Sequence, residues 1–401
     1  MAMAIEALVC DASGTLLDAR LNPQLGVINM LARLTALGVR VVVAANHTEG
    51  ETRRQLQHAG LLAFVDHIIA REHVSKDKGS PVWVDKFQEL TGLQANQFFY
   101  LGNSLYDMIT ATRGPMVYAH SAWSGAAPYR YGLVAPTPGW VAAVIQHIFR
   151  KHHNWYWTMR GTDPSGRDLH AVTMIDANGA GGDQHLRRAL LDLLKEDQDS
   201  TLGPINLKEF VMLHMLASLN NDGAFADAQL WVTYPGHLGG PNHIMGDFLA
   251  VAAKLARNKY KPDLLYRHSH AERSNAAFRH DGIVGALRNQ LETMCVGADF
   301  RKTLRDKRVL LLDNFLTWGS TTETGRNLLL TAGAATVKVA CVGKYGARMY
   351  AVGAPAEAWD PFGTRPPPVS TFRYEERSGS TDAAALREFA ASYAGMAGER
   401  W

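Results

Sequence analysis

Two short segments of the chain carry residues that could act on a phosphorylated compound. In the first, the acid Asp313 and the amide Asn314 stand a few residues before Gly319 and a group of hydroxyl side chains. The hydroxyls belong to Thr317, Ser320 and Thr321. A glycine lets the backbone approach a ligand, and a helix that begins after such a turn offers unpaired N–H groups and a positive dipole end. This spacing predicts a phosphate-binding turn, with Asp313 within reach of a sugar attached to the phosphate.

The second segment follows an apolar run at residues 5–10. Asp11 comes directly after this run, and Gly14 and Thr15 form a turn that would expose its carboxylate. An aspartate at the carboxyl end of a strand is well placed to attack phosphorus. The segment therefore predicts a nucleophile directed at a phosphate group.

Strands and helices must position these residues, and the apolar pattern predicts both. Aliphatic runs predict strands at 5–10, 41–46, 98–101, 169–175, 229–234, 263–266 and 308–312. Helical spacing predicts helices at 21–37, 140–153, 185–194, 207–218, 243–256, 322–330 and 382–393. Alternating strands and helices favour parallel sheets, whose ligands lie at the carboxyl ends of the strands. We expect both segments to lie at such an edge.

The composition is that of an ordinary globular protein. The 401 residues favour two domains, and 41 basic against 38 acidic residues give no strong case for nucleic-acid binding. No apolar run approaches the length of a membrane span, and the N-terminal pattern is not that of a secretory leader. Cys10, Cys295 and Cys341 lack a metal-binding spacing and are expected to be reduced. We expect a soluble, cytoplasmic protein.

The segment around Asp11 resembles the first motif of the haloacid dehalogenase (HAD) superfamily. Further motifs follow in the superfamily's order: the strand at 41–46, Lys78, and the loop that contains Asn103 and Asp107. The resemblance implies that Asp11 is the nucleophile and that Lys78 binds phosphate. It also implies a Mg²⁺ site formed by Asp11, Asn103 and Asp107.

Three positions depart from the superfamily pattern. Ser13 stands in the place of the general acid, Ala45 in that of a phosphate-binding hydroxyl, and Asn103 in that of a magnesium-binding acid. Loss of a positioned general acid typically costs about 10²–10⁴ in rate. The resemblance therefore implies a weak phosphatase, or a domain used for binding or assembly. Too few residues separate the motifs for a cap domain.

The segment around Asp313 resembles the phosphoribosyl-pyrophosphate (PRPP) signature of type I phosphoribosyltransferases. The resemblance implies that residues 317–321, including Trp318 and Gly319, hold the 5′-phosphate, and that Asp313 and Asn314 bind the ribose hydroxyls. Asn314 replaces the second acid of the signature, and Trp318 replaces a small hydroxyl residue. A generic strand, turn and helix is the alternative interpretation.

Two neighbouring features fit the same resemblance. A Gly-rich loop at 235–242, which contains Gly236, follows a predicted strand where the family places its pyrophosphate loop. Arg267 follows the strand at 263–266 and opens a basic stretch similar to that of ComF-like phosphoribosyltransferases. The resemblance implies that Arg267 and the loop bind magnesium pyrophosphate. A solvated basic face is the alternative for the basic stretch.

The expected fold class is α/β, with two Rossmann-like parallel-sheet domains. A capless HAD-like domain is predicted over residues 1–150 and a phosphoribosyltransferase-like domain over 165–350. Residues 351–401 are expected to form a tail that ends in a helix, and its segment 354–380, rich in Pro and Gly, is expected to add no strand.

The expected function is PRPP-dependent phosphoribosyl transfer to or from a nucleobase-like acceptor, whose identity no motif encodes. The expected ligands are PRPP or a nucleotide monophosphate, the nucleobase-like molecule and Mg²⁺. A homo-oligomer or partner enzymes of a nucleotide pathway are expected, and no membrane partner. Two alternatives stay open: a protein that binds PRPP or a nucleotide without turnover, and a structural partner in a larger assembly.

Overall fold

Strand β1 (Ala7–Asp11) lies inside a six-stranded sheet with the order β3-β2-β1-β4-β5-β6. All strand pairs of this sheet are parallel. The other strands are β2 (Arg40–Ala45), β3 (His67–Ala70), β4 (Phe98–Gly102), β5 (Val117–Ser121) and β6 (Leu133–Ala135). The computed structural model of the chain describes residues 4–129, 131–151, 155–179, 184–196, 198, 206–236, 243–255 and 259–399.

Helices connect these strands and bury their faces. They are α1 (Val27–Ala36), α2 (Glu49–His58), α3 (Arg71–Val74), α4 (Val82–Thr91), α5 (Leu105–Arg113) and α6 (Pro138–Val144), which continues into a π-helical turn, Ile145–Phe149. The hydroxyls of Thr48, Ser104 and Thr137 accept first-turn N–H groups and so begin α2, α5 and α6. Within residues 4–129 no domain is inserted between β1 and β5, as the spacing of the motifs predicts.

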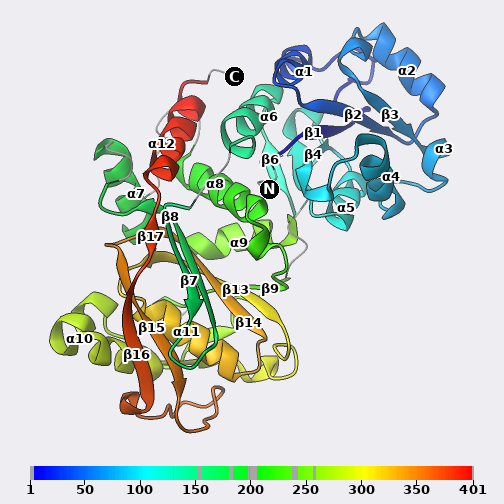
Figure 1. Cartoon of the computed structure of the whole chain (residues 1–401). Helices are drawn as coiled ribbons and strands as arrows, with labels where there is room; N and C mark the ends of the chain where they lie inside the picture. The colour runs from blue at the N-terminus through cyan, green and yellow to red at the C-terminus, as the bar shows by residue number, and fades with distance from the viewer. Residues whose placement is uncertain are drawn as a thin grey trace.

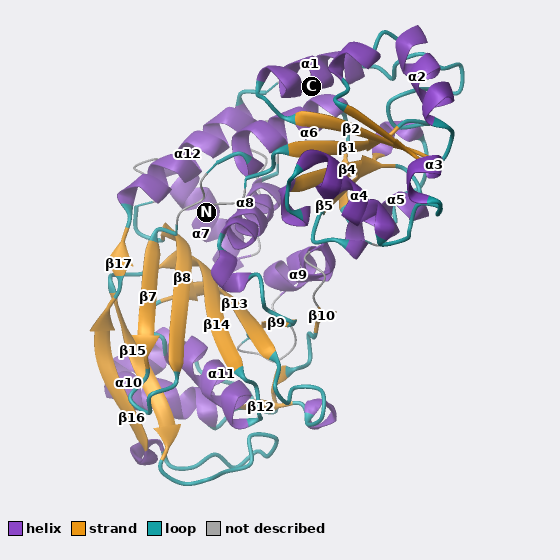
Figure 2. Ribbon diagram, turned by 45° about the vertical axis from the view of Figure 1, so that its right-hand side comes forward, coloured by secondary structure: helices purple, strands orange, loops and turns teal. Residues whose placement is uncertain are grey.

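A second, seven-stranded sheet has the order β10-β9-β13-β14-β8-β7-β17 (Figure 2). Its first five strands are parallel, whereas β7 is antiparallel to β8 and β17 to β7. The strands are β7 (Trp157–Thr162), β8 (Asp168–Asp176), β9 (Leu230–Thr233), β10 (Lys259–Tyr260), β13 (Arg308–Leu316), β14 (Thr336–Lys344) and β17 (Ser380–Thr381). The α/β class and a parallel six-stranded sheet are therefore confirmed, and the second sheet is only partly parallel.

The helices of this second lobe cover its sheet and link it to the first lobe. They are α7 (Gln184–Glu196), α8 (Leu207–Asn221), α9 (His243–Leu255), α10 (Ser274–Leu291), α11 (Ser320–Thr331) and α12 (Ala383–Ala397). Helix α10 is two helices joined at a kink, because Asp281 and Gly282 leave the helical conformation. In the part of the chain that the structure describes, no helix is long and apolar enough to cross a membrane.

Two predictions about the second lobe are wrong. The strand predicted at 263–266 is not part of the parallel sheet, because β11 (Leu265–Arg267) pairs antiparallel with β12 (Met294–Val296) in a ribbon of its own. The segment at 354–380 does contribute strands. β15 (Arg348–Pro355) and β16 (Phe372–Ser378) form a second ribbon, and β17 pairs with the edge strand β7. The prolines at 366–368 lie between β15 and β16, where a missing N–H breaks no ladder.

The two lobes are joined through helices rather than by a bare linker (Figure 1). Helix α12 contacts β8 of the second sheet and also α6 and the Ile145–Phe149 turn of the first lobe. One apolar core contains buried residues of both lobes, from Val9 in β1 to Val342 in β14 and Phe389 in α12. Because burial of apolar surface drives packing, this shared core fixes the lobes against each other.

Candidate functional site

The first candidate site surrounds Asp11, the last residue of β1. Lys78 donates hydrogen bonds to Asp11 and to Asp107, the latter at 2.7 Å between Nζ and Oδ1. Asp11, Lys78 and Asp107 are all buried. The structure therefore brings together the predicted nucleophile, the predicted phosphate-binding lysine and one predicted metal ligand, with the lysine between the two carboxylates.

Both carboxylate oxygens of Asp107 are occupied by donors. Oδ1 accepts from Lys78 and from the Tyr100 hydroxyl at 3.1 Å. Oδ2 accepts from the backbone N–H groups of Asn103 and Ser104, at 3.2 and 3.0 Å, and from the Ser104 hydroxyl at 2.6 Å. Asp107 thus closes the loop after β4 and anchors Lys78, and it is 0% exposed.

Asn103, one of the predicted metal ligands, instead makes a hydrogen bond within the protein. Its Nδ2 donates to the backbone carbonyl of Ser13 at 3.2 Å. The fit is close, since a Cβ atom on Gly14, which has a φ of 77°, would lie 2.1 Å from the same Nδ2. The Asn103 amide therefore ties the loop after β4 to the loop after β1.

In this site the two carboxylates of Asp11 and Asp107 share the single ammonium group of Lys78. Burial and the nearby Asp107 carboxylate raise the pKa of Asp11 to about 6, although Lys78 opposes this shift. Of the three residues predicted to bind Mg²⁺, Asp11 and Asp107 are acids, and both already accept hydrogen bonds from protein donors. Mg²⁺ prefers anionic oxygen ligands. Lys78 is shared by Asp11 and Asp107, so one net negative charge is left, and both oxygens of Asp107 are already held by donors. With one net charge and few free oxygens, the residues present do not fit a tightly held Mg²⁺ ion.

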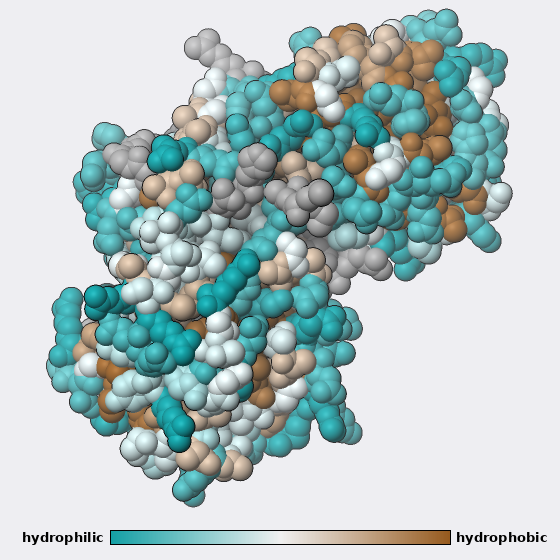
Figure 3. All heavy atoms as spheres, viewed as in Figure 1, coloured by the Kyte–Doolittle hydropathy of each residue, from teal (hydrophilic) through white to brown (hydrophobic). Residues whose placement is uncertain are grey.

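The N-terminal lobe exposes several large apolar side chains. Exposed apolar side chains lie on the N-terminal lobe (Figure 3), and Leu25, in the segment after β1, is 94% exposed. Tyr106, at the beginning of α5, is 55% exposed. Ala45 ends β2 with a buried methyl group where a hydroxyl would be needed. No general acid stands at position 13, as the sequence indicates.

The second candidate site is a cleft of about 560 Å³ in the C-terminal lobe. It lies where β9 and β13 end and α11 begins. Among the described residues, the cleft is lined by those that the PRPP resemblance implicates, namely Gly236, Arg267, Asp313, Asn314, Thr317, Trp318, Gly319, Ser320 and Thr321. Residues 237–242 of the predicted pyrophosphate loop lie outside the described part of the chain.

The phosphate turn has the backbone geometry that the sequence predicts. Gly319 is the residue before α11 and has a φ of 84°, and no side chain caps the helix. A Cβ atom at this position would lie 3.0 Å from Met349 Cε and 3.1 Å from the Tyr350 carbonyl oxygen. Only glycine fits without strain. The uncapped first turn of α11 leaves N–H groups and a positive dipole end for an anion.

Positive side chains surround the cleft, and few of them have acidic partners. Lys195, Arg273 and Arg279 line it and form no ion pair with any described residue. Lys195 Nζ lies 5.8 Å from the centre of the Phe315 ring, which also lines the cleft. The surplus of positive charge favours a polyanionic ligand.

All three guanidinium nitrogens of Arg267 donate hydrogen bonds to protein groups. Its Nε donates to the Gly236 carbonyl at 3.0 Å, and its two terminal nitrogens donate to Thr293 and Gln290, both at 2.5 Å. Arg267 therefore shapes the wall of the cleft. Of the arginines that line the cleft, Arg273 and Arg279 have no side-chain hydrogen bond to another described residue.

Asp313 and Asn314 differ in what they offer a ligand. Burial raises the pKa of Asp313 to about 7, against the opposing effects of the Asn314 N–H and of Arg267. The Asn314 side chain is turned toward α7, where its Nδ2 donates to the Leu194 carbonyl at 2.9 Å. Asp313 is thus a half-buried acid facing the cleft, whereas the Asn314 amide nitrogen joins β13 to α7.

Two supports of the turn escape the sequence motifs. Lys344, at the end of β14, is fully buried and donates to the carbonyl oxygens of Thr317, Tyr345 and Arg348 at 2.8 to 2.9 Å. Burial lowers the pKa of Lys344 to about 8. A lysine at the end of an apolar run is the only sequence signal for this contact, and it does not identify the partner carbonyls.

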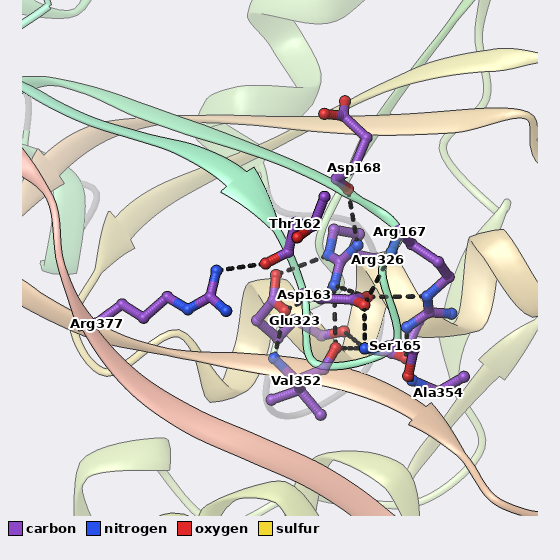
Figure 4. Close-up of polar contacts among 11 residues, drawn as sticks. Thr162, Asp163, Ser165, Arg167, Asp168, Glu323, Arg326, Val352, Ala354 and Arg377 are labelled. Atoms are coloured by element: carbon purple, nitrogen blue, oxygen red, sulfur yellow. Dashed lines mark hydrogen bonds and ion pairs between the residues drawn. The ribbon is translucent and has the colours of Figure 1, made fainter.

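The second support is a buried ionic network beneath α11 (Figure 4). Arg326 lies 2.8 Å from Glu323 and 2.7 Å from Asp163, and all three side chains are fully buried. Glu323 also accepts from the Val352 N–H at 2.8 Å. Burial raises the pKa of Asp163, but the hydrogen bond and charge of Arg326 outweigh it, so this pKa is lowered. The network joins α11 to the β7–β8 turn and to β15.

Comparisons with known proteins reach the N-terminal lobe. Residues 2–119 match the family model of haloacid dehalogenase-like hydrolases, so this lobe is HAD-like. No curated protein matches the chain at a significant level.

Several solved structures are similar to part of the chain. A HAD-superfamily hydrolase of subfamily IA, variant 1, from Geobacter sulfurreducens is 14% identical, with 34% of this chain and 96% of that chain covered and a TM-score of 0.30. A haloacid dehalogenase-like hydrolase from Streptococcus pneumoniae is 13% identical, with 35% and 97% covered and a TM-score of 0.31. A HAD-superfamily hydrolase from Ehrlichia chaffeensis is 18% identical, with 31% of this chain and 58% of that chain covered and a TM-score of 0.27. The chain spans 54% of the length of another relative, from Lactobacillus delbrueckii.

Proposed function

We propose that the C-terminal lobe binds PRPP in its cleft and transfers the ribose 5-phosphate to a nucleobase-like acceptor. In this reaction the bond between C1′ and the pyrophosphate oxygen breaks, a bond between C1′ and an acceptor nitrogen forms, and the acceptor loses a proton. The observation that carries the proposal is that the glycine turn, the uncapped start of α11 and three cations without an acidic partner among the described residues lie in one cleft. A ligand with phosphates at both ends would contact the glycine turn, the start of α11 and the cations together.

The residues of the cleft divide naturally between the parts of PRPP. The first turn of α11 and the Thr321 hydroxyl suit the 5′-phosphate, because N–H and O–H groups there are donors without a protein cap. Arg273, Arg279 and Lys195 suit the pyrophosphate, which gains negative charge as it leaves. Asp313 suits the ribose hydroxyls, and its ionised form would also stabilise positive charge that develops on the ribose.

Binding without turnover is the second candidate, and a specific observation favours it. Asn314 stands where the signature has its second acid, and its amide nitrogen is committed to Leu194. Arg267, the residue first expected to stabilise the leaving group, has hydrogen bonds from all three guanidinium nitrogens to the protein. A PRPP-binding regulatory protein would keep the phosphate turn and tolerate both features.

The HAD-like lobe is proposed to be a weak phosphatase or a binding module. Asp11 is present as a nucleophile, but no acid stands at position 13 to protonate a leaving group, and Lys78 is shared between Asp11 and Asp107. Both features lower the expected rate on phosphate monoesters with poor leaving groups.

The test is calorimetric titration of the full chain with PRPP, with and without Mg²⁺, followed by measurement of pyrophosphate release in the presence of a panel of nucleobases. Saturable binding with release supports a transferase, and binding without release supports the regulatory candidate. If PRPP and ribose 5-phosphate both fail to bind at millimolar concentration, the proposal is wrong.

A further inference from the structure

A buried glutamine connects opposite walls of the cleft. Helix α10 reverses direction at Gly282, whose φ of 56° and ψ of −146° suit only glycine. The reversal brings Gln290, near the end of α10, back to Ser274 at its beginning, with 2.8 Å between Gln290 Nε2 and Ser274 Oγ. Gln290 is 1% exposed, so its amide contacts protein groups rather than water.

The orientation of the Gln290 amide is fixed by its partners. Arg267 Nη2 lies 2.5 Å and the Tyr234 hydroxyl 2.9 Å from the same atom of Gln290. A guanidinium group donates hydrogen bonds and cannot accept them. The atom that faces Arg267 is therefore the carbonyl oxygen, and the amide nitrogen must face Ser274 as a donor.

This orientation sets the direction of the next hydrogen bonds. Because Ser274 Oγ accepts from Gln290, its own proton is available to Thr321 Oγ1, which lies 3.1 Å away. Either hydroxyl of this pair can donate; when Ser274 donates, Thr321 accepts and keeps its own proton. Among the described residues no acceptor takes that proton, and Thr321 lines the cleft on the first turn of α11.

We propose that Gln290 is a positioning residue that makes the Thr321 hydroxyl a donor to the ligand's phosphate. The hydrogen bonds run from Arg267 through Gln290 and Ser274 to Thr321. The first two have one direction each, and in our proposal the third runs from Ser274 to Thr321. Gln290 touches no ligand itself. The inference rests on the proposed function, since the phosphate at Thr321 is taken to be the 5′-phosphate of PRPP.

The decisive variant is Gln290→Glu. It keeps the shape of the side chain but replaces the amide N–H donor with a carboxylate oxygen that can only accept hydrogen bonds. A carboxylate still accepts from Arg267 and Tyr234 but cannot donate to Ser274. Ser274 then donates to the carboxylate and accepts from Thr321, so the Thr321 proton turns away from the ligand. We expect the affinity for ribose 5-phosphate, measured by calorimetry on the full chain, to fall about tenfold or more.

A double-mutant cycle separates this effect from added negative charge. Thr321→Val removes the hydroxyl, so Gln290→Glu should weaken binding little further in the Thr321→Val background, whereas a purely electrostatic effect would add in full. Asn289→Asp is the matched control. It adds the same charge one residue away and alters the contacts with Glu272, at 2.8 and 2.9 Å, without touching the chain to Thr321. It should weaken binding less than about threefold.

The outcomes distinguish failure of the Gln290 proposal from failure of the proposed PRPP-binding function. Folding of each variant is checked by its thermal midpoint. If Thr321→Val weakens binding but Gln290→Glu leaves it unchanged, or if the two penalties add, Gln290 has no positioning role while the proposed function stands. If the unmodified protein binds neither ribose 5-phosphate nor PRPP, both fail.

Discussion

Thr321 provides the most direct test of the phosphate turn. Thr321→Ala removes a hydroxyl that faces the cleft and leaves the backbone of α11 intact, so PRPP affinity should fall by about 1.5–3 kcal/mol, the cost of a charge-assisted hydrogen bond. Calorimetry measures the loss. Thr364→Ala, at an exposed threonine between β15 and β16, is the control and should bind as the unmodified protein does. Unchanged affinity in a folded Thr321→Ala protein contradicts the assignment of this turn.

Gly319→Val addresses the same turn but is a less selective test. The substitution forces a β-branched residue to a φ of 84° and brings its Cβ within 3.0 Å of Met349. We therefore expect Gly319→Val to lower both PRPP affinity and the thermal midpoint. A loss of affinity with an unchanged midpoint would show that the turn has more room than these contacts indicate.

Asp313 predicts a pH dependence of stability. Its pKa is raised to about 7 in the folded protein, against about 3.9 for an ordinary aspartate, so the folded state binds the proton more tightly. The stabilisation is complete below about pH 4 and is lost as the pH rises through about 7. Denaturant unfolding from pH 4 to 8 should show this slope, and Asp313→Asn should flatten it. An equal slope in both proteins would place the ionisation elsewhere.

Repair of the HAD-like site tests two residues together. Ser13→Asp combined with Asn103→Asp supplies a leaving-group acid and a second metal-binding acid, and should raise hydrolysis of a sugar phosphate by about 10² or more. p-Nitrophenyl phosphate should gain less, because its leaving group needs little protonation. Asp11→Asn in the same background should abolish the gain. Rapid turnover of a nucleoside monophosphate by the unmodified protein, lost in Asp11→Asn, would mean that the site is already competent.

The sequence predicts which strands the candidate residues end, but not the contacts around them. The spacing after each apolar run predicted that Asp11 and Asp313 end strands, because strand periodicity is a local property. It could not predict that Asp107 would be saturated by donors or that Asn314 would turn toward Leu194, since these contacts join distant parts of the chain. Gln290 gave no signal, because its role depends on the reversal of α10.

The network beneath α11 should make that helix intolerant of single charge removals. Arg326→Met would leave Glu323 and Asp163 buried without their partner, at a cost of about 3–5 kcal/mol in the free energy of unfolding. Arg167→Met removes a partly exposed arginine that contacts the same Asp163 and should cost much less. Chemical denaturation of both variants measures the difference. Equal, small losses would indicate that water replaces the Arg326 contacts.

The elements most clearly predicted were those with long apolar runs, and the errors lie where pairing is not local. The strand at 263–266 has the composition of a sheet strand, but β11 pairs with β12 beside the kinked helix instead of joining β9 or β13. The prolines of the segment at 354–380 predict that it adds no strand. The prolines at 366–368 occupy the connection, and the residues on either side are free to form β15 and β16.

The whole chain should unfold in a single transition, because α12 packs against both lobes. Phe389 in α12 is 1% exposed and lies 5.1 Å from Phe210 in α8, ring centre to ring centre. Phe389→Ala should cost about 3–5 kcal/mol and shift one calorimetric transition, whereas Arg387→Ala, exposed on the same helix, should shift it little. Two separate transitions, with only one moved by Phe389→Ala, would show that the lobes unfold independently.

The return of α12 to α6 also bears on the order in which the molecule is made. Synthesis proceeds from the N-terminus, and domains tend to fold as they emerge. Here the π-helical turn at Ile145–Phe149, made early, gains its contacts with α12 only after nearly two hundred and fifty further residues, by the numbering, have left the ribosome. A chain that ends before α12 would therefore expose the apolar surface of α6 and of the Ile145–Phe149 turn that α12 normally covers. Exposed apolar surface of this kind makes an incomplete chain prone to aggregation until α12 has been made.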